Sequence, residues 1–401
     1  LINWEIVSVN PNDKNWNWKD LFCFWAVSIQ SVIGFSLIAS LYLAYDLNFF
    51  VVFYGGILAS ILAFIFSTYI GKPSQKHGLP FPVILRTSTG VIGAQYVALI
   101  RGIVGIFMFG VQTFFISKAI GYLLRILIFS VNREFMENEI LLTFFMGMNL
   151  IDIISFIFTL YIQYILFSKG QHFVRSIIRF SSYFVYFGLG IFLILITEHF
   201  QDVIKSVELS LNYKNFFSKS NIAPLITVTG TLFAFYSIII LNFGDFSRYV
   251  KSNDQLIKGN LSLLLNFILF SLFAILIILG ADIILSKNAI EVDRLLTNPN
   301  DIIGKLNNTF LSTVVIIFII VASCSTNLIA NYIPSQNILI NFLPNKLNLN
   351  NSGLIIILIS FFVGLFWLPV LSQIGILSIL DTLGSFFGPI FGVMIADYFI
   401  I

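Results

Sequence analysis

The residues best suited to bind a small solute begin at Ala322, where hydroxyl and carboxamide side chains interrupt an apolar run. In a helix each residue turns by about 100°, so Ala322, Ser325 and Thr326 share one face. Asn327 and Asn331 share another face. Hydroxyl oxygens suit a hard cation, whereas carboxamides can donate to and accept from a planar polar molecule. The alternative is that these Ser and Asn side chains hold packed membrane helices together.

The composition predicts an all-α polytopic membrane protein. Of the 401 residues, 58% are hydrophobic and 10% are charged, whereas soluble domains carry roughly 25% charged residues. The net charge of +3 is small and spread along the chain, so we expect no nucleic-acid partner and no obligate protein partner. Cys23 and Cys324 lie in apolar runs, which predicts free thiols. The three histidines lack metal-ligand spacing, and we expect no cofactor.

Apolar runs of the right length recur along the whole chain. A membrane-spanning helix needs about 20 mostly apolar residues, and about ten stretches qualify: 20–45, 47–71, 94–129, 139–168, 176–197, 223–247, 259–285, 309–336, 352–371 and 374–400. We expect short surface helices in the two longest links, 198–222 and 286–308. The chain lacks an initiator Met and stops where an apolar helix finishes, so we expect both ends to be truncated.

The charges of the connecting segments predict an orientation. Loops 72–91, 168–180 and 248–258 are rich in Lys and Arg, whereas 131–139 carries three acids against one arginine. Because basic loops stay in the cytoplasm, we expect the amino terminus and these basic loops to be cytoplasmic. The abundance of Phe, Ile, Asn and Lys suggests a bacterial source, so the compartment would be the inner membrane.

Two helices carry small or polar residues near mid-membrane and begin about 200 residues apart. The first has Ser28, Gln30, Ser31 and Gly34, and the sixth has Thr227, Thr229 and Gly230, then Asn242 and Gly244. Paired interrupted helices at corresponding positions indicate an inverted-repeat transporter with its site at the midplane. We therefore expect a single transporter domain with one repeat at about 20–197 and the other at about 223–400.

Several ordered motifs closely resemble the nucleobase:cation symporter family, which includes cytosine, uracil, allantoin and hydantoin permeases. The motifs are His77–Gly93, Leu99–Gly102, Met108–Thr113, Asn15–Asp20, Leu241–Tyr249, Ser325–Asn331 and Gly388–Tyr398. The resemblance implies a five-plus-five inverted-repeat core of the LeuT-like type, with helices one and six unwound. Members usually have twelve helices, so the last two would be missing here.

The resemblance also implies a site. A coupling sodium ion would lie between helices one and eight, bound by the carbonyls of Ala26, Ile29 and Ala322 and the hydroxyls of Ser325 and Thr326. The substrate would lie between helices one, three, six and eight. The matching lining positions are Gln30, Met108, Gly110, Gln112, Tyr236 and Asn331.

Two of these positions depart from the family pattern. Hydantoin-binding members sandwich the flat ring between two tryptophans, and Met108 and Tyr236 occupy those positions here. Tyr can stack and offers a hydroxyl, whereas Met is a flexible filler. Either side chain could also be plain packing, and Gln112 could simply bond a neighbouring helix.

The leading functional hypothesis is therefore a sodium-coupled transporter of a nucleobase or related cyclic amide, working by alternating access in the bilayer. The alternatives are a proton-coupled permease of the same substrates and a non-transporting remnant or sensor. A membrane enzyme would need a convergent nucleophile, base or metal set, and the scattered histidines and the lack of an intramembrane carboxylate pair disfavour it.

Overall fold

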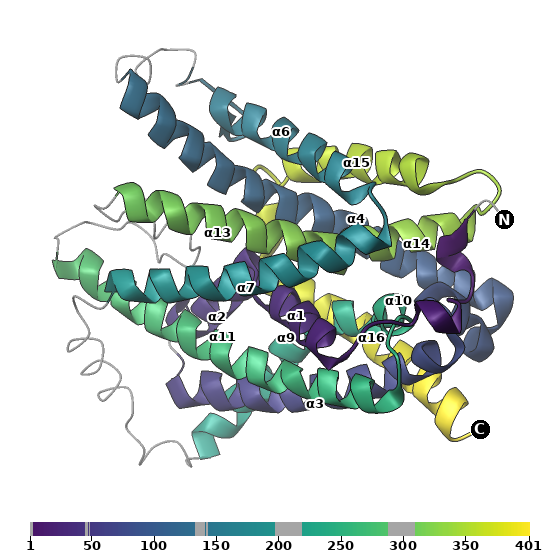
Figure 1. Cartoon of the computed structure of the whole chain (residues 1–401). Helices are drawn as coiled ribbons and strands as arrows, with labels where there is room; N and C mark the ends of the chain where they lie inside the picture. Colours follow the sequence, from purple (N-terminus) through teal and green to yellow (C-terminus); the bar gives the residue numbers. More distant parts are fainter. Residues whose placement is uncertain are drawn as a thin grey trace.

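The computed structural model describes residues 3–44, 47, 49–132, 141, 143–196, 219–287 and 309–401, and these residues are mostly helical (Figure 1). The expected surface helices in 198–222 and 286–308, and the acidic loop 131–139, lie mainly outside this described part. The elements are α1 (Trp18–Ile29), α2 (Val32–Ala39), α3 (Phe49–His77), α4 (Phe81–Val131), β1 (Phe144–Phe145), β2 (Met148–Asn149), α6 (Leu150–Phe167), α7 (Gln171–Ile196), α9 (Ile222–Leu241), α10 (Gly244–Ser247), α11 (Asn253–Lys287), α13 (Thr309–Asn327), α14 (Ile333–Phe342), α15 (Leu349–Leu365) and α16 (Ile376–Phe399).

The predicted all-helical membrane fold is confirmed. Seven helices in the described part are long and apolar enough to cross a membrane, and the bent pair α1–α2 would make an eighth. The α15 helix is apolar but shorter. Large apolar side chains such as Tyr183 and Phe187 on α7 are exposed, which is the surface expected of a helix that faces lipid. The two cysteines are free thiols, as predicted.

Some helix boundaries differ from the apolar runs. The α3 helix continues to His77 and α4 begins at Phe81, so the predicted loop 72–91 is mostly helical and bends at Gly90, which has a φ of 69°. Pro82 suits the first turn of a helix because its missing N–H would have no partner there. Within the predicted span 139–168, a β-hairpin whose turn includes Gly147, with a φ of 76°, precedes the helix α6, which begins at Leu150.

The predicted break in the first helix is present at Gln30 and Ser31. The α1 and α2 axes differ by 58° there. The Ser31 hydroxyl accepts a hydrogen bond from the Gly34 N–H and caps α2. A side chain on Gly34 would collide with the Ile29 carbonyl, 2.8 Å from the expected Cβ position. The glycine thus lets the second half of the helix pack against the end of the first.

Of the positions at which a break in the sixth helix is expected, Thr227, Thr229 and Gly230 are helical, whereas Asn242 interrupts the helix. The α9 helix is continuous from Ile222 to Leu241, and the interruption lies at its end, at Asn242, before the short helix α10. The Thr229 hydroxyl lies 2.8 Å from the Leu225 carbonyl, so its polarity is satisfied within the helix. A single glycine such as Gly230 costs only about 1 kcal/mol in a helix, which does not break it.

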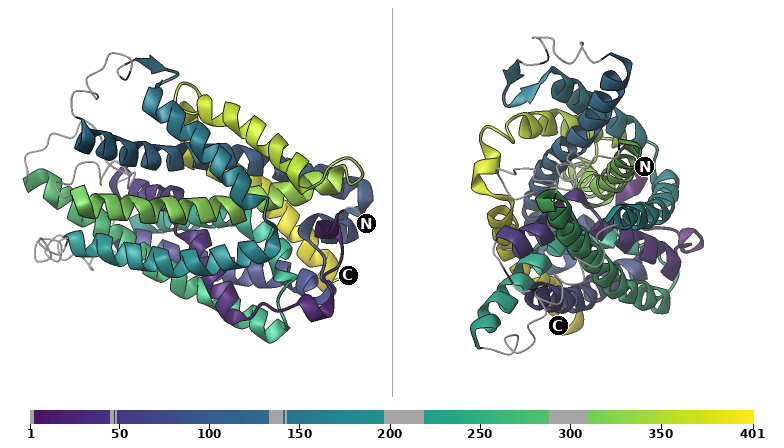
Figure 2. Two further views of the ribbon diagram at one scale, coloured as in Figure 1. Left: turned by 45° about the horizontal axis from the view of Figure 1, so that its top comes forward. Right: turned by 90° about the vertical axis from the view of Figure 1, so that its left-hand side faces the viewer.

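The helices form two packed groups (Figures 1 and 2). In the first, α3 packs on α9 and α11, and α11 also packs on α1. In the second, α4 packs on α6, α13, α14 and α15. Helix α7 joins the groups because it contacts both α1 and α13. Between α13 and α14 the chain makes a π-helical turn, Leu328–Tyr332.

The amino-terminal segment lies across one end of the bundle, where the two chain termini are found (Figure 1). The Val9 N–H donates to the Gly78 carbonyl, and the Trp16 N–H donates to the Tyr249 carbonyl. Asp20, in the first turn of α1, pairs with Arg175 and Arg179 of α7 at 2.7 and 2.6 Å. These contacts fix the start of α1, which leads to the break at Gln30.

Candidate functional site

A network of buried polar side chains joins α4 to the π-helical turn in the middle of the bundle. The Asn331 amide donates to Gln112 Oε1 at 3.2 Å and to Asn327 Oδ1 at 2.9 Å. The Asn327 amide in turn donates to Thr113 Oγ1 at 3.0 Å. The Thr113 hydroxyl also lies 2.8 Å from Gln163 Oε1 on α6. Because unpaired amides are costly at bilayer depth, this closed network stabilises the contact between the helices.

The structure therefore brings Gln112 and Asn331 together, as predicted. Gln112 also donates through Nε2 to the Ser323 carbonyl at 3.2 Å, so both atoms of its carboxamide are bonded to α13 and the π turn. A solute that binds these carboxamides has to replace the bond between them. Gln112 and Asn331 also connect packed helices, which is the alternative role predicted for them. A role in helix packing and a role in substrate binding are compatible.

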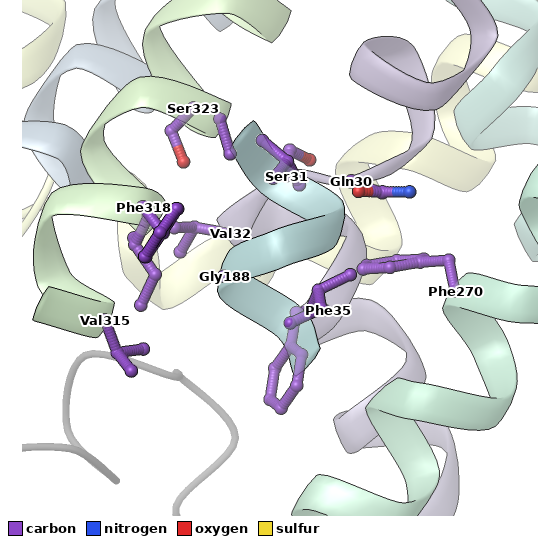
Figure 3. Close-up of a pocket in the computed structure, with 13 residues that line it drawn as sticks. Gln30, Ser31, Val32, Phe35, Gly188, Phe270, Val315, Phe318 and Ser323 are labelled. Atoms are coloured by element: carbon purple, nitrogen blue, oxygen red, sulfur yellow. The ribbon is translucent and has the colours of Figure 1, made fainter. Parts of the chain in front are cut away.

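Gln30 lies at the break of the first helix and faces a cavity between α1, α2, α7, α11 and α13 (Figure 3). Its side chain is only 2% exposed. Within the described part of the chain neither atom of its carboxamide makes a hydrogen bond of ordinary geometry, although the Tyr186 side chain of α7 lies near it. The cavity volume is about 50 Å³, which is room for a few water molecules.

Ser323 connects this cavity to the carboxamide network. Its side chain lines the cavity, its hydroxyl is buried without a partner among the described residues, and its carbonyl accepts from Gln112. Figure 3 shows Phe318 on the side of Ser323, and Phe35 and Phe270 on the side of Gln30. The cavity thus has polar side chains at one end and aromatic side chains along its walls, and aromatic faces suit stacking against a flat ring.

The remaining predicted substrate residues lie elsewhere around this region. Met108 is buried in the apolar core. Tyr236 on α9 packs edge-on against Phe267 of α11, with ring centroids 5.2 Å apart. Gly110 faces α15, because a side chain at that position would meet Val363 at 2.8 Å. None of these three lines the cavity beside Gln30, and Gly110 brings α4 and α15 into close contact.

The predicted sodium ligands on α13 meet the first helix at one point. The Thr326 hydroxyl lies 2.6 Å from the Val27 carbonyl of α1 and 3.0 Å from the Ala322 carbonyl. The Ser325 hydroxyl lies 2.6 Å from that of Ser181 on α7 and 2.8 Å from the Val321 carbonyl. Oxygen atoms of α1, α7 and α13 thus meet in two contacts made by neighbouring residues of α13, and we call them the oxygen cluster. Oxygen atoms are the ligands that a hard cation requires.

Two contributors to this oxygen cluster were not predicted. The carbonyl that touches Thr326 is that of Val27, whereas the Ala26 carbonyl accepts from the Gln30 N–H and the Ile29 carbonyl accepts from the Ser31 N–H. Ser181 was also missed. Its signal in the sequence is a pair of serines, 181 and 182, within the apolar run of the fifth helix.

A bundle of apolar spans that encloses a polar site beside a broken helix defines a membrane transport protein. Comparison with known protein families identifies the family of this transport protein. The chain belongs to the family of permeases for cytosine/purines, uracil, thiamine and allantoin, whose model matches residues 8–401. The predicted family is thereby confirmed, and the chain is a permease and not an enzyme.

Individual relatives show the same similarity over the whole chain. It is 28% identical to an allantoin permease of Bacillus subtilis, with 100% of this chain and 79% of the relative covered. It is 26% identical to a putative allantoin permease of Escherichia coli, with 99% and 79% covered.

Solved structures support the fold. Mhp1, a nucleobase-cation-symport-1 family transporter in a closed conformation with bromovinylhydantoin bound, matches with a TM-score of 0.73 at 16% identity, covering 99% of this chain and 81% of Mhp1. A Na⁺-coupled sialic acid symporter matches with a TM-score of 0.67 at 14% identity, covering 97% and 80%. The boundaries of the two repeats stay a prediction.

Proposed function

We propose that this permease imports a nucleobase or a related cyclic amide or ureide together with sodium, by alternating access across the cytoplasmic membrane, with its amino terminus in the cytoplasm. The observation that carries the substrate class is the buried set of carboxamides Gln30, Gln112 and Asn331, of which Gln30 has no partner in the described structure. A carboxamide offers an acceptor and two donors, so it pairs with the edge of a cyclic amide. The family includes permeases for such rings.

Sodium coupling is supported by the oxygen cluster at Thr326 and Ser325. Each hydroxyl donates its single proton, to the Val27 or the Val321 carbonyl, and keeps its lone pairs available for a cation. One positive charge that moves inward through 100 mV gains about 2.3 kcal/mol, and the sodium gradient adds to this. Because the cluster joins α1 to α13, an ion bound there would favour the conformation in which these helices touch.

A ligand screen tests the substrate class. Purified protein is heated with cytosine, uracil, purines, hydantoin or allantoin, each with and without sodium. We expect at least one ring to raise the apparent melting temperature, since a ligand stabilises the folded state by mass action. Counterflow of the labelled ring in proteoliposomes then tests transport. Binding without counterflow would favour a sensor, and counterflow driven by a proton gradient but unaffected by sodium would favour a proton-coupled permease.

The double substitution Ser325→Ala, Thr326→Ala tests the ion. Alanine suits a helix, so the fold should persist while the two hydroxyl ligands are lost. We expect sodium to stop enhancing substrate binding. Thr313→Ala is the matched control, because Thr313 lies in the same helix and its hydroxyl bonds only the Thr309 carbonyl in an exposed position. Undiminished sodium activation in the double variant would exclude these hydroxyls as ligands.

A further inference from the structure

The Arg101 side chain is buried inside the bundle and is not part of the site described above. It lies on α4 and is 0% exposed. Among the described residues no carboxylate lies within 4.0 Å of its guanidinium. An ionisable side chain at such depth is expensive and is by default a functional residue. Its partners therefore indicate its role.

The guanidinium is held by two main-chain carbonyls. Its Nε donates to the Ile238 carbonyl of α9 at 3.1 Å, and its Nη2 donates to the Ala330 carbonyl of the π turn at 2.8 Å. The third nitrogen, Nη1, has no hydrogen-bond partner in the described structure. One side chain thus connects three helices: its own, α9 and the segment between α13 and α14.

Neither carbonyl receives the usual α-helical bond from the N–H four residues later. The N–H of Asn242, four residues after Ile238, bonds the Ile240 carbonyl where α9 ends. The residue four after Ala330 is Pro334, which has no N–H. The Ile238 carbonyl also lies in the last turn of α9, where the helix dipole favours a cation. These two acceptors hold the charge without a carboxylate in direct contact, and Asp245 of α10 adds a favourable electrostatic interaction from farther away.

The same two carbonyls flank the proposed substrate residues. Ile238 follows Tyr236 by two positions, and Ala330 directly precedes Asn331. Helix α9 belongs to the group packed around α3, whereas α4 packs on α13 and α14. Arg101 therefore joins the two helix groups at the level where each contributes a substrate residue.

Gly105, one turn further along α4, keeps space for this arrangement. A side chain there would collide with the Ser335 hydroxyl and would lie 2.8 Å from Arg101 Nη1. The glycine thus allows the guanidinium to lie flat between α4 and α14. The position of the charge is built into the packing and is not the outcome of one flexible side chain.

We propose that Arg101 is a positioning residue of the substrate site. Its guanidinium fixes the backbone of α9 next to Tyr236 and that of the π turn next to Asn331, and so sets the distance between the two sides of the site. This inference rests on the proposed function for the identity of the substrate residues. The restraint on the two backbone segments can be measured without any substrate.

The substrate-free test is amide hydrogen exchange in Arg101→Met and Arg101→Lys. Loss of both bonds should raise exchange at least tenfold in peptides covering 236–242 and 328–335, because the carbonyls lose the cross-helix donor that Arg101 provides. Lysine keeps the charge but lacks the planar fork that reaches both carbonyls, so its effect should be intermediate. Arg125→Met is the matched control: it removes an arginine from the other end of α4, where it pairs with Asp152. Wild-type exchange in Arg101→Met would overturn the proposal.

The second readout is binding of radiolabelled allantoin, or of whichever ring stabilises the wild type most. Arg101→Met should weaken binding roughly ten- to a hundredfold, the effect of losing hydrogen bonds from a charged group. In that background Asn331→Ala should cost much less than it costs alone, because both changes disturb one arrangement. In the Arg125→Met background it should cost its full amount. Additive effects of Arg101→Met and Asn331→Ala would overturn the positioning role. If the wild type binds none of the rings, the proposed function fails, and the exchange comparison still decides whether Arg101 restrains the two segments.

Discussion

The polar side chains of the site differ in how completely the protein satisfies them. Gln112 is bonded at both atoms, to Asn331 and to the Ser323 carbonyl, so a ligand gains only the difference between the new and the old bonds there. Gln30 has no partner in the part of the chain that the structure describes, and a buried amide left in that condition costs roughly 1–3 kcal/mol. A ligand that bonds Gln30 recovers this cost. Gln30 is therefore expected to contribute most to affinity, and Gln112 with Asn331 to selectivity.

Asn331→Ala tests the carboxamide edge. The change removes the donor to Gln112 Oε1 and to Asn327 Oδ1. It leaves buried acceptors unpaired, so binding of the preferred ring should weaken about five- to a hundredfold. Met108→Trp should narrow the range of accepted rings, because a rigid aromatic wall replaces a flexible side chain. Both are measured as ligand affinities across the same set of rings. Unchanged affinity of Asn331→Ala for every ring that binds the wild type would remove Asn331 from the site.

Asp245 predicts a pH dependence of stability. It lies in α10, beyond the end of the α9 span, and burial raises its pKa from 3.8 to about 6, although Arg248 opposes the rise. Between these two values the folded protein binds a proton that the unfolded chain does not bind. The contribution of Asp245 to the free energy of unfolding therefore increases as the pH falls from about 7 through 6, and becomes constant below about 4.

The measurement for Asp245 is the melting temperature in detergent between about pH 7 and pH 5, for the wild type and for Asp245→Asn. Asparagine keeps the shape and can still accept from the Phe81 N–H, the bond that Asp245 makes at 3.1 Å. The stability of the wild type relative to the variant should rise as the pH is lowered. Parallel curves for the two proteins would show that Asp245 does not titrate in this range.

At the scale of the elements, the sequence predicts the existence of helices well because apolar runs report burial in lipid directly. It also predicts the break at Gln30 and Ser31, where polar residues and Gly34 coincide. The sequence does not show that α9 stays helical at Thr229. The Thr229 hydroxyl bonds a carbonyl of its own helix, and the spacing of the polar residues is the same whether the helix continues or breaks.

The oxygen cluster shows a second limit of prediction. Whether Thr326 meets the carbonyl of Ala26, Val27 or Ile29 depends on how α1 and α13 are rotated against each other, and no local pattern encodes that rotation. The pairing of Ser325 with Ser181 is of the same kind. The sequence predicts which residues share a helix face. Which faces touch each other depends on how the helices pack, and only the structure shows this.

Close contact between α1 and α11 depends on Gly259. A Cβ atom at this position would lie 2.5 Å from the Leu21 Cβ, so Gly259→Ala forces two helices apart. Overpacking of this kind typically costs about 1–3 kcal/mol, and we expect a lower melting temperature. Gly190→Ala is the control, because no atom lies within 4 Å of its expected Cβ and alanine is the better helix former. Equal stability of both variants would contradict the close packing of α1 on α11.

At the scale of the whole molecule, charged side chains hold the amino-terminal segment against the end of the bundle where the termini lie. The Lys14 amine donates to the Gln75 carbonyl at 2.6 Å, and Arg248 donates to the Glu5 carbonyl at 2.6 Å. Asp20 is paired with two arginines of α7. These contacts close the end of the bundle that we predict to face the cytoplasm, so substrate release on that side requires some of them to separate. Further inside the bundle, the bond from Arg101 to α9 joins the helix group around α3 to the helix group around α4.

The orientation can be tested with single cysteines. In a background with Cys23 and Cys324 replaced by alanine, one new cysteine is introduced at Lys76, Lys251 or Ser130, all of which are exposed. Lys76 ends α3 and Lys251 precedes α11, both in the basic segments, whereas Ser130 lies at the opposite end of α4. Because basic segments remain on the cytoplasmic side, an impermeant maleimide applied to intact cells should label Ser130→Cys and leave Lys76→Cys and Lys251→Cys unlabelled. Permeabilised cells should give labelling at all three positions, which shows that the cysteines are reactive.

Labelling of Lys76→Cys and Lys251→Cys from outside, with Ser130→Cys protected, would invert the topology. The amino terminus would then face outward, and the charged contacts at that end would guard the entry of the substrate instead of its release.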